Sequence, residues 1–331
     1  MERLIECVPN FSEGRDKKII ASIAEAIASA GPKVLNIDPG EAANRTVITF
    51  AGTPEDVCEG AFRGVMKAAE LIDMRKHHGT HPRSGATDVL PLVPVSGVTL
   101  EECAEMARTL AKRIYDELGI ACYCYEAAAF RPEFRNLAVC RAGEYEALPE
   151  KLADPQRRPD FGPETMTPAI EKFGAINVGA RNYLIAVNFN LDTESTKLAN
   201  AIAFDVREKG RIAPDGTRVP GTLKGCKALG WFIEEYGIAQ VSMNITDIDA
   251  TPLHRAFEEV SRAAEVRGVH VTGTEIIGLV PERVLLEAGR YFLGGDASDE
   301  DLIDAAVEAM GLSDLRPFVP SEKILEPRIK P

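Results

Sequence analysis

The feature that most constrains this chain is the order in which two hydrophobic periodicities alternate along it. Apolar residues recur every second position where a strand is expected, and three or four positions apart where a helix is expected. In the first half the segments run strand, helix, strand, strand, helix, strand, at residues 4–8, 20–27, 34–37, 46–50, 53–72 and 89–95. A further helix at 99–118 and a strand at 121–125 follow. This order predicts the ferredoxin-like βαββαβ arrangement.

The second half repeats that order without a convincing repeat of the residues themselves. Its segments lie at residues 183–189, 193–208, 228–233, 239–244, 251–267 and 269–274, and two helices are expected at 281–292 and 299–310. Between the halves, residues 148–173 contain five prolines and few periodic apolar residues, which predicts a linker or long loop. We therefore expect an α/β (α+β) fold of two ferredoxin-like subdomains, residues 1–176 and 177–331, with a ligand cleft between them.

Charge and cysteine content narrow the class of function. The 331 residues carry a formal net charge of −13, which argues against broad nucleic-acid binding and against docking to anionic membranes. The amino terminus lacks the pattern of a signal peptide, and no apolar run is long enough to span a bilayer. The seven cysteines are scattered and form no CxxC pair, as in core residues of a reducing compartment. These features predict a cytoplasmic protein.

The densest polar cluster lies at residues 73–85, and it holds three of the five histidines of the chain. Gly79 and Pro82 exclude a continuous helix, so this segment is predicted to be a loop before the strand at 89–95. Three interpretations stay open: general acid/base catalysis by a histidine beside basic residues, a metal site of His77, His78 and His81, or a solvated basic loop.

Other signals are weaker. Gly174 to Arg181 has glycine spacing like a phosphate-binding loop, but Ala-Arg stands where Lys-Ser or Lys-Thr is required. Asp38 could orient a histidine or simply occupy a turn. Arg181 could pair with a carboxylate or lie on the surface.

Several longer motifs go further than these local signals. They are Glu6-Cys-Val-Pro-Asn-Phe-Ser-Glu-Gly14, Asn44-Arg-Thr46, Gly79-Thr-His-Pro-Arg83, Arg141-Ala-Gly-Glu-Tyr-Glu-Ala-Leu148, Pro159-Asp-Phe-Gly-Pro163, Gly179-Ala-Arg181, Ala239-Gln-Val-Ser242 and Ile277-Gly-Leu-Val-Pro281. In this order and over essentially the whole chain, they resemble the glutamate formimidoyltransferase (formiminotransferase) family.

The resemblance implies a one-carbon transferase of histidine degradation. Such an enzyme moves the formimino group of N-formimino-L-glutamate to N5 of tetrahydrofolate, and it releases 5-formimino-tetrahydrofolate and L-glutamate. Tetrahydrofolate is then a co-substrate, and no metal is expected. The resemblance also implies a homodimer or larger assembly. Some relatives are fused to a cyclodeaminase, and because this chain ends at Pro331, a separate formimidoyltetrahydrofolate cyclodeaminase is the expected partner.

The resemblance also assigns roles to residues. The catalytic histidine falls on His81 and its supporting aspartate on Asp38. The folate-binding stretch falls on the loop that begins at Gly162 and continues as Pro163, Glu164, Thr165, Met166, Thr167 and Pro168, up to Gly174. Local cations must hold the substrate carboxylates, and the candidates are Arg45, Arg75, Lys76, Arg83 and Arg181.

Three other functions remain open from the sequence. The same site could exchange a formyl group between 5-formyl-tetrahydrofolate and glutamate, because the two donors differ by O in place of NH. The chain could be a non-catalytic folate-binding protein, although the intact His81 loop argues against this. A metal-dependent hydrolase is the third alternative.

Overall fold

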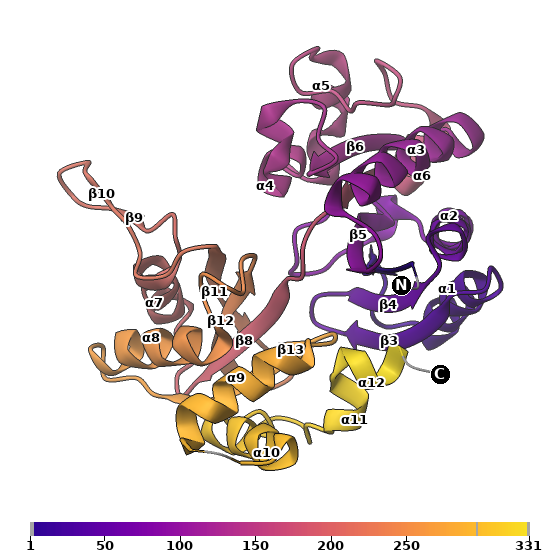
Figure 1. Cartoon of the computed structure of the whole chain (residues 1–331). Coiled ribbons are helices and arrows are strands. Elements are labelled where there is room, and N and C mark those ends of the chain that lie inside the picture. Colours follow the sequence, from indigo (N-terminus) through magenta and orange to yellow (C-terminus); the bar gives the residue numbers. More distant parts are fainter. Residues whose placement is uncertain (1–2, 296, 330–331) are drawn as a thin grey trace. The chain divides into compact units, whose positions relative to one another are not determined.

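The chain forms two compact units, Met1–Asn182 and Tyr183–Pro331 (Figure 1). The computed structural model describes residues 3–295 and 297–329. The sequence placed the boundary after residue 176, within a strand that belongs to the first unit.

The first unit contains a seven-stranded sheet. Its strands are β1 (Leu4–Cys7), β2 (Asn10–Phe11), β3 (Lys33–Gly40), β4 (Arg45–Gly52), β5 (Thr87–Ser96), β6 (Ala121–Glu126) and β7 (Ala175–Ala180). Both β1 and β2 pair with β4 on one side and with β5 on the other, so they are two parts of one strand interrupted at Val8 and Pro9. With β3 on the outer side of β4, these strands have the order of a ferredoxin-like sheet, which confirms the prediction.

Two further strands extend this sheet beyond β5. β7 pairs in parallel with β5 and β6 and therefore lies between them. The glycines of residues 174–181 have the spacing of a phosphate-binding loop without its Lys-Ser or Lys-Thr, and no strand was predicted here. All six residues of β7 are buried, so the strand has the continuous apolar character of a parallel strand covered on both faces.

Residues 148–173 form a long loop with a short helix at each end, and they pack within the first unit rather than linking the two units. They contain α5 (Leu148–Ala153) and α6 (Pro168–Phe173), and Phe161 forms an isolated bridge to Cys122 of β6. Leu148, Ile170 and Phe173 are fully or almost fully buried. The prolines that suggested a linker partly serve as first residues of short helices, where a proline costs no hydrogen bond.

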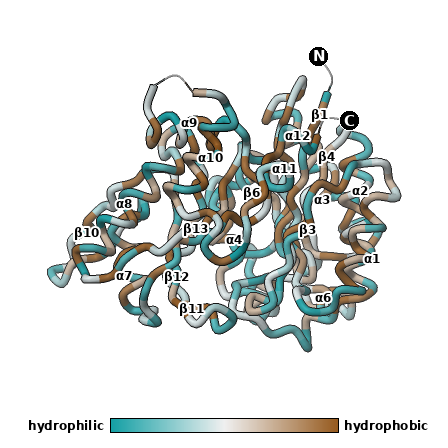
Figure 2. The backbone as a smooth tube through the Cα atoms, turned by 90° about the horizontal axis from the view of Figure 1, so that it is seen from below, coloured by the Kyte–Doolittle hydropathy of each residue, from teal (hydrophilic) through white to brown (hydrophobic). Residues whose placement is uncertain are grey.

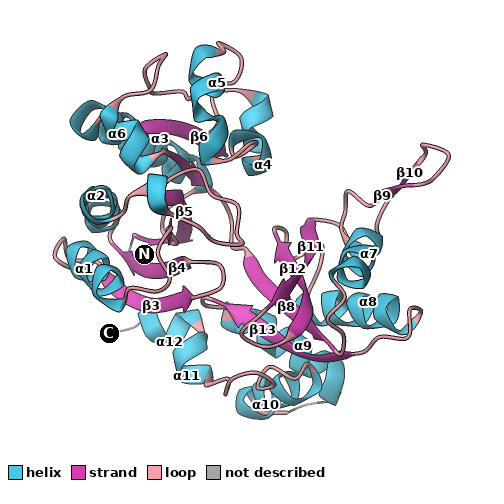
Figure 3. Ribbon diagram, turned by 180° about the vertical axis from the view of Figure 1, so that it is seen from behind, coloured by secondary structure: helices cyan, strands magenta, loops and turns pink. Residues whose placement is uncertain are grey.

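Three long helices cover one face of the first sheet (Figure 3). They are α1 (Lys17–Ala28), α2 (Pro54–Leu71) and α3 (Leu100–Leu118). Thr53 and Thr99 cap α2 and α3 through their hydroxyl oxygens. The apolar sides of these helices pack against the strands in one core. Hydrophobic and hydrophilic residues alternate along each helix (Figure 2). The opposite face of the sheet carries the polar residues described below.

Short helices complete the first unit around the candidate site. They are α4 (Leu137–Cys140) and the 3₁₀ turns η1 (Met74–Lys76), η2 (Pro132–Arg135) and η3 (Tyr145–Ala147).

The second unit contains a four-stranded antiparallel sheet in the order β11-β12-β8-β13. The strands are β8 (Ile185–Leu191), β11 (Cys226–Ile233), β12 (Ile238–Ile245) and β13 (Val271–Ile277), and the helices between them are α7 (Thr196–Val206) and α8 (Leu253–Glu265). This is the ferredoxin-like order again, so the second prediction is also confirmed.

The remaining elements of the second unit follow or interrupt that motif. The helices expected near the carboxyl terminus are α9 (Glu282–Leu293) and α10 (Asp299–Ala309), and they are followed by α11 (Pro320–Lys323) and α12 (Leu325–Ile329). A small ribbon of β9 (Arg211–Ile212) and β10 (Arg218–Val219), which the sequence did not reveal, projects from the second unit (Figure 1). Within the described ranges, no helix has the length and apolar character needed to cross a membrane.

Candidate active site

A β-bulge places a carboxylate at the centre of the candidate site. Asn10 and Phe11 of β2 lie opposite Val89 and Thr87 of β5, so Asp88 is an extra residue in the ladder. Bulges redirect a side chain relative to its neighbours and are common beside active sites. The side chain of Asp88 is completely buried.

Two arginines from distant parts of the chain bind this carboxylate. Arg45 at the start of β4 approaches Asp88 Oδ2 to 2.6 Å with Nη1, and Arg141 just after α4 approaches the same oxygen to 2.7 Å with Nη2. Arg45 Nε also donates to Asn10 Oδ1 at 2.9 Å. Burial alone would raise the pKa of Asp88, but Arg141 and Arg45 outweigh it and lower the pKa to about 2. Two guanidinium groups therefore face one carboxylate, and the cluster carries a net positive charge within an acidic protein.

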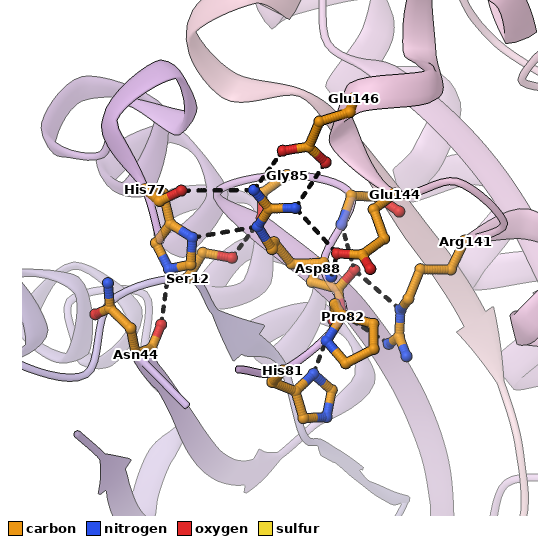
Figure 4. Close-up of polar contacts among 12 residues, drawn as sticks. Ser12, Asn44, His77, His81, Pro82, Gly85, Asp88, Arg141, Glu144 and Glu146 are labelled. Atoms are coloured by element: carbon orange, nitrogen blue, oxygen red, sulfur yellow. Dashed lines mark hydrogen bonds and ion pairs between the residues drawn. The ribbon is translucent and has the colours of Figure 1, made fainter. Parts of the chain in front are cut away.

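His81 lies next to this cluster (Figure 4). Its Nδ1 lies 2.7 Å from the carbonyl oxygen of Pro82. A carbonyl oxygen can only accept, so Nδ1 carries the proton and the neutral ring has its lone pair on Nε2. Burial, with further contributions from Arg45 and Arg141, lowers the pKa of His81 to about 3. The ring is consequently neutral near pH 7 and able to accept a proton.

Asp38 lies on the same face of the sheet as Arg45. Asp38 is opposite Val47 and Gly40 is opposite Arg45, and side chains two positions apart on a strand point the same way. Asp38 and Arg45 are thus diagonal neighbours on adjacent strands. The carboxylate of Asp88 also acts on His81. Its negative charge raises the pKa of the ring, but burial and the two arginines lower the pKa by more.

The five basic candidates occupy different surroundings. Arg45 belongs to the Asp88 cluster, and Arg181 follows β7, where its charge lowers the pKa of Tyr125 against the stronger effect of burial. The guanidinium group of Arg83 is bound by Glu146 at 2.7 Å and by Glu144 at 3.0 Å. Arg75 forms a two-point contact with its neighbour Asp73, and Lys76 is exposed at the end of η1. The structure therefore brings Arg45 to His81, and it engages Arg83 and Arg75 with acidic side chains of the protein.

The end of the expected folate stretch lies against the segment that follows the histidine loop. Gly174 forms a bridge with Gly85, and the amide of Ala175 donates to Ser84 O at 2.9 Å. A Cβ atom on Gly174 would lie 2.2 Å from Ser84 O, so this contact requires glycine.

Earlier residues of the stretch have local structural contacts. Thr167 caps α6 through its hydroxyl oxygen and Pro168 is the first residue of that helix. Glu164 pairs with Arg158 at 2.6 Å, and Met166 packs against a small core cluster.

Two members of the cluster, Asp88 and Arg141, were not predicted from the sequence. The signal for Asp88 was present, because it is the one charged residue in the apolar run from residue 86 to 95. A charged side chain in a buried strand is usually paired with an opposite charge, because burying an unpaired charge is costly. Arg141 stood in a motif that carries the resemblance, but no local pattern connected it to Asp88.

The metal interpretation of the three histidines finds no corresponding geometry. In the described part of the chain, no group of three or more His, Cys, Asp or Glu side chains is arranged to hold a metal ion. His77 Nε2 instead lies 2.9 Å from Asn44 O.

Comparison with family models decides the relationship of the chain. Residues 4–181 match the N-terminal subdomain of the formiminotransferase domain, and residues 186–330 match the formiminotransferase domain. The chain belongs to the formiminotransferase family.

Two kinds of relative share this formiminotransferase sequence. Formimidoyltransferase-cyclodeaminase of Sus scrofa is 44% identical over 98% of this chain, but the chain spans only 60% of the length of that relative. Glutamate formimidoyltransferase of Streptococcus pyogenes serotype M1 is 42% identical over 88% of this chain and 94% of its own length. The enzyme of the same name from Thermoplasma acidophilum is 41% identical over 90% of this chain and 94% of its own length. A solved microcompartment protein from Desulfitobacterium hafniense aligns with a TM-score of 0.23 at 10% identity over 83% of this chain and 94% of that one, which is too low to bear on the fold.

Proposed function

We propose that this chain is a glutamate formimidoyltransferase, which transfers the formimino group of N-formimino-L-glutamate to N5 of tetrahydrofolate. The observation that carries the proposal is a neutral histidine, His81, beside a buried cluster with net positive charge, Arg45–Asp88–Arg141. The names of the relatives that the chain covers almost completely agree with this activity.

The reaction needs a group that first accepts a proton and then returns it. N5 of tetrahydrofolate attacks the electrophilic formimino carbon, and a tetrahedral intermediate forms. The nitrogen N5 must then lose a proton, and the glutamate nitrogen must gain one before it leaves. In this proposal His81 Nε2 performs both transfers, because its lone pair is available in the neutral tautomer held by Pro82. Tetrahydrofolate acts as a co-substrate, and the proposed chemistry uses no metal ion.

The positive cluster has two proposed effects. Arg45 and Arg141 attract the carboxylates of the substrates, and Arg181 and the exposed Lys76 are the further candidates. A bound carboxylate would also offset the charge of the arginines and so raise the pKa of His81 from its low value in the free protein. Substrate binding would thereby make His81 a better base when it is needed.

The other parts of the site complete the proposal. Asp38, on the same sheet face as Arg45, would stabilise the protonated ring of His81. Residues 162–174 would bind folate, and their contact with Ser84 and Gly85 supports a position close to the histidine loop.

The biological setting belongs to the same proposal. We place the enzyme in the cytoplasm, because all seven cysteines are free thiols and six of them are buried. We also propose a homodimer, and a cyclodeaminase as the consumer of the product, because relatives such as the Sus scrofa protein carry both names.

The variant His81→Ala tests the proposed role of His81. Turnover should fall by about 10²–10⁴-fold, which is the usual contribution of a general acid/base. The midpoint of thermal unfolding and the binding of tetrahydrofolate should stay close to those of the unmodified protein, because the ring is a partly buried loop residue. Near-normal turnover would refute the role of His81.

A further inference from the structure

A second histidine of the loop, His77, is buried and held on both ring nitrogens. It is 7% exposed, although it lies in a segment that reads as a polar loop. Nε2 lies 2.9 Å from the carbonyl oxygen of Asn44 (Figure 4). Nδ1 lies 3.4 Å from Nε of Arg83. The carbonyl oxygen can only accept and the guanidinium N–H can only donate. His77 must therefore be a neutral ring with its proton on Nε2.

The contact to Asn44 joins the histidine loop to the turn that precedes Arg45. Asn44 adopts a left-handed conformation with φ of 47°. Its side chain donates to His78 O at 2.9 Å and accepts from the amide of Gly14 at 3.0 Å. A Cβ atom on Gly79 would lie 2.3 Å from Ala43 O, so the two segments are in direct backbone contact. The position of Arg45 is thus tied to the loop that carries His81.

The contact to Arg83 joins the same ring to the segment after Arg141. Arg83 is 8% exposed, and its guanidinium group binds Glu144 and Glu146. The carbonyl oxygen of Arg83 also accepts from the amide of Tyr145 at 3.0 Å. These bonds fix the segment that starts at Arg141, and His77 lies between it and the Asn44 turn.

We propose that His77 is a positioning residue that holds Arg45, His81 and Arg141 in one arrangement. The two hydrogen bonds of its ring connect the segments that carry these three residues. The expected effect on turnover rests on the proposed function, whereas the connection between the segments does not depend on it. Displacement of a reacting group by about 1 Å can cost about 10²-fold in rate, so this support is worth a measurable factor.

Two amide variants separate the two bonds. In His77→Gln the side-chain N–H reaches the position of Nε2 and keeps the bond to Asn44, but the acceptor for Arg83 is lost. In His77→Asn the side-chain oxygen takes the position of Nδ1 and keeps the acceptor, but the shorter bond to Asn44 is lost. Because the Asn44 bond is 2.9 Å and the Arg83 bond is 3.4 Å, we expect the Asn44 bond to matter more.

The expected result is a difference in kcat between the two variants. His77→Asn should lower kcat by about 10–100-fold with little change in KM, and His77→Gln should retain kcat within about threefold. His78→Gln is the matched control, because it changes the adjacent exposed ring and leaves in place the carbonyl that Asn44 contacts. Equal kcat for His77→Gln and His77→Asn would overturn the proposal, whether both fall or both stay normal.

Amide hydrogen exchange over residues 42–45 and 77–83 provides a readout that does not need the reaction. His77→Asn should speed exchange in both segments, and His77→Gln should leave it close to that of the unmodified protein. Unchanged exchange in His77→Asn would overturn the positioning role. An unmodified protein that is inactive with the proposed substrates, but shows this exchange pattern, would instead contradict the proposed function.

Discussion

At the scale of single residues, the buried carboxylate of Asp88 controls the candidate site. It lies between Arg45 and Arg141, and without it two guanidinium groups would face each other in a dry environment. Asp88→Asn should therefore lower the free energy of unfolding by about 3–5 kcal/mol, the usual cost of breaking a buried ion pair. Urea unfolding measures this change.

Asp249→Asn is the matched control for Asp88→Asn. It removes an ion pair in which the aspartate side chain is 77% exposed, so its effect should be about 0–1 kcal/mol. Equal losses in the two variants would show that the Asp88 cluster contributes no more than a surface pair.

His81 gives a second prediction at this scale. Its pKa in the folded protein is about 3, whereas an unperturbed histidine has a pKa of about 6.5. As the pH falls below 6.5 the unfolded chain takes up this proton before the folded protein does, so the contribution of His81 to stability is lost as the pH falls towards 3. An NMR titration should find the ring of His81 neutral at pH 5, with the signal assigned by its absence in His81→Ala. A titration midpoint near 6.5 would contradict the described electrostatics.

Some residues of the candidate site could be predicted from the sequence and others could not. His81 and Arg45 were proposed because both stand in motifs that carry the family resemblance, Gly79-Thr-His-Pro-Arg83 and Asn44-Arg-Thr46. Asp88 enters the site because a bulge adds one residue to a strand ladder, and Arg141 joins it across 53 positions of the chain. Such long-range pairing has no local signature.

At the scale of elements, the contact between Gly174 and Ser84 connects the proposed folate stretch to the histidine loop. Gly174 has φ of +85° and no room for a Cβ atom, whereas Gly216 has φ of +84° and nothing within 4 Å. Both Gly→Ala changes introduce backbone strain of about 1–3 kcal/mol, but Gly174→Ala must also displace Ser84. Gly174→Ala should therefore lower stability more than Gly216→Ala, and it should also lower turnover. If Gly174→Ala and Gly216→Ala lower the free energy of unfolding equally and affect turnover equally, the proposed connection is refuted.

The segment at residues 148–173 gives the other prediction at this scale. Phe173 is 1% exposed, so Phe173→Ala should cost about 3–5 kcal/mol in urea unfolding. Glu150→Ala, whose side chain is 81% exposed in α5, should stay within about 0.5 kcal/mol. A small effect of Phe173→Ala would restore the interpretation of this segment as a linker.

Periodicity identified the long elements but not the short ones. The strands and helices of both βαββαβ motifs were predicted from their apolar periodicity or, as in β5, from a continuous apolar run. The strand β7 was missed because its apolar run is short and is interrupted by Asn177 and Gly179. The helices α5 and α6 have six residues each, which is too short for a helical period to be recognised.

At the scale of the whole molecule, the chain repeats one topology twice with different additions. The first unit gains the parallel strands β7 and β6 beyond β5, and the second gains the ribbon and the carboxyl-terminal helices. The sequence predicted both motifs because the order of elements determines the ferredoxin-like sheet once helices must pack on one face. All of the residues that we place in the catalytic cluster belong to the first unit.

The stoichiometry of the reaction tests the proposed formimino transfer most directly. The unmodified protein is mixed with N-formimino-L-glutamate and tetrahydrofolate, and both 5-formimino-tetrahydrofolate and released L-glutamate are measured, with 5-formyl-tetrahydrofolate and glutamate as a parallel donor and acceptor pair. We expect the two products in equal amounts and much faster turnover than in the formyl reaction. Absence of both products while tetrahydrofolate still binds, or faster formyl transfer, would contradict the proposed formimino transfer.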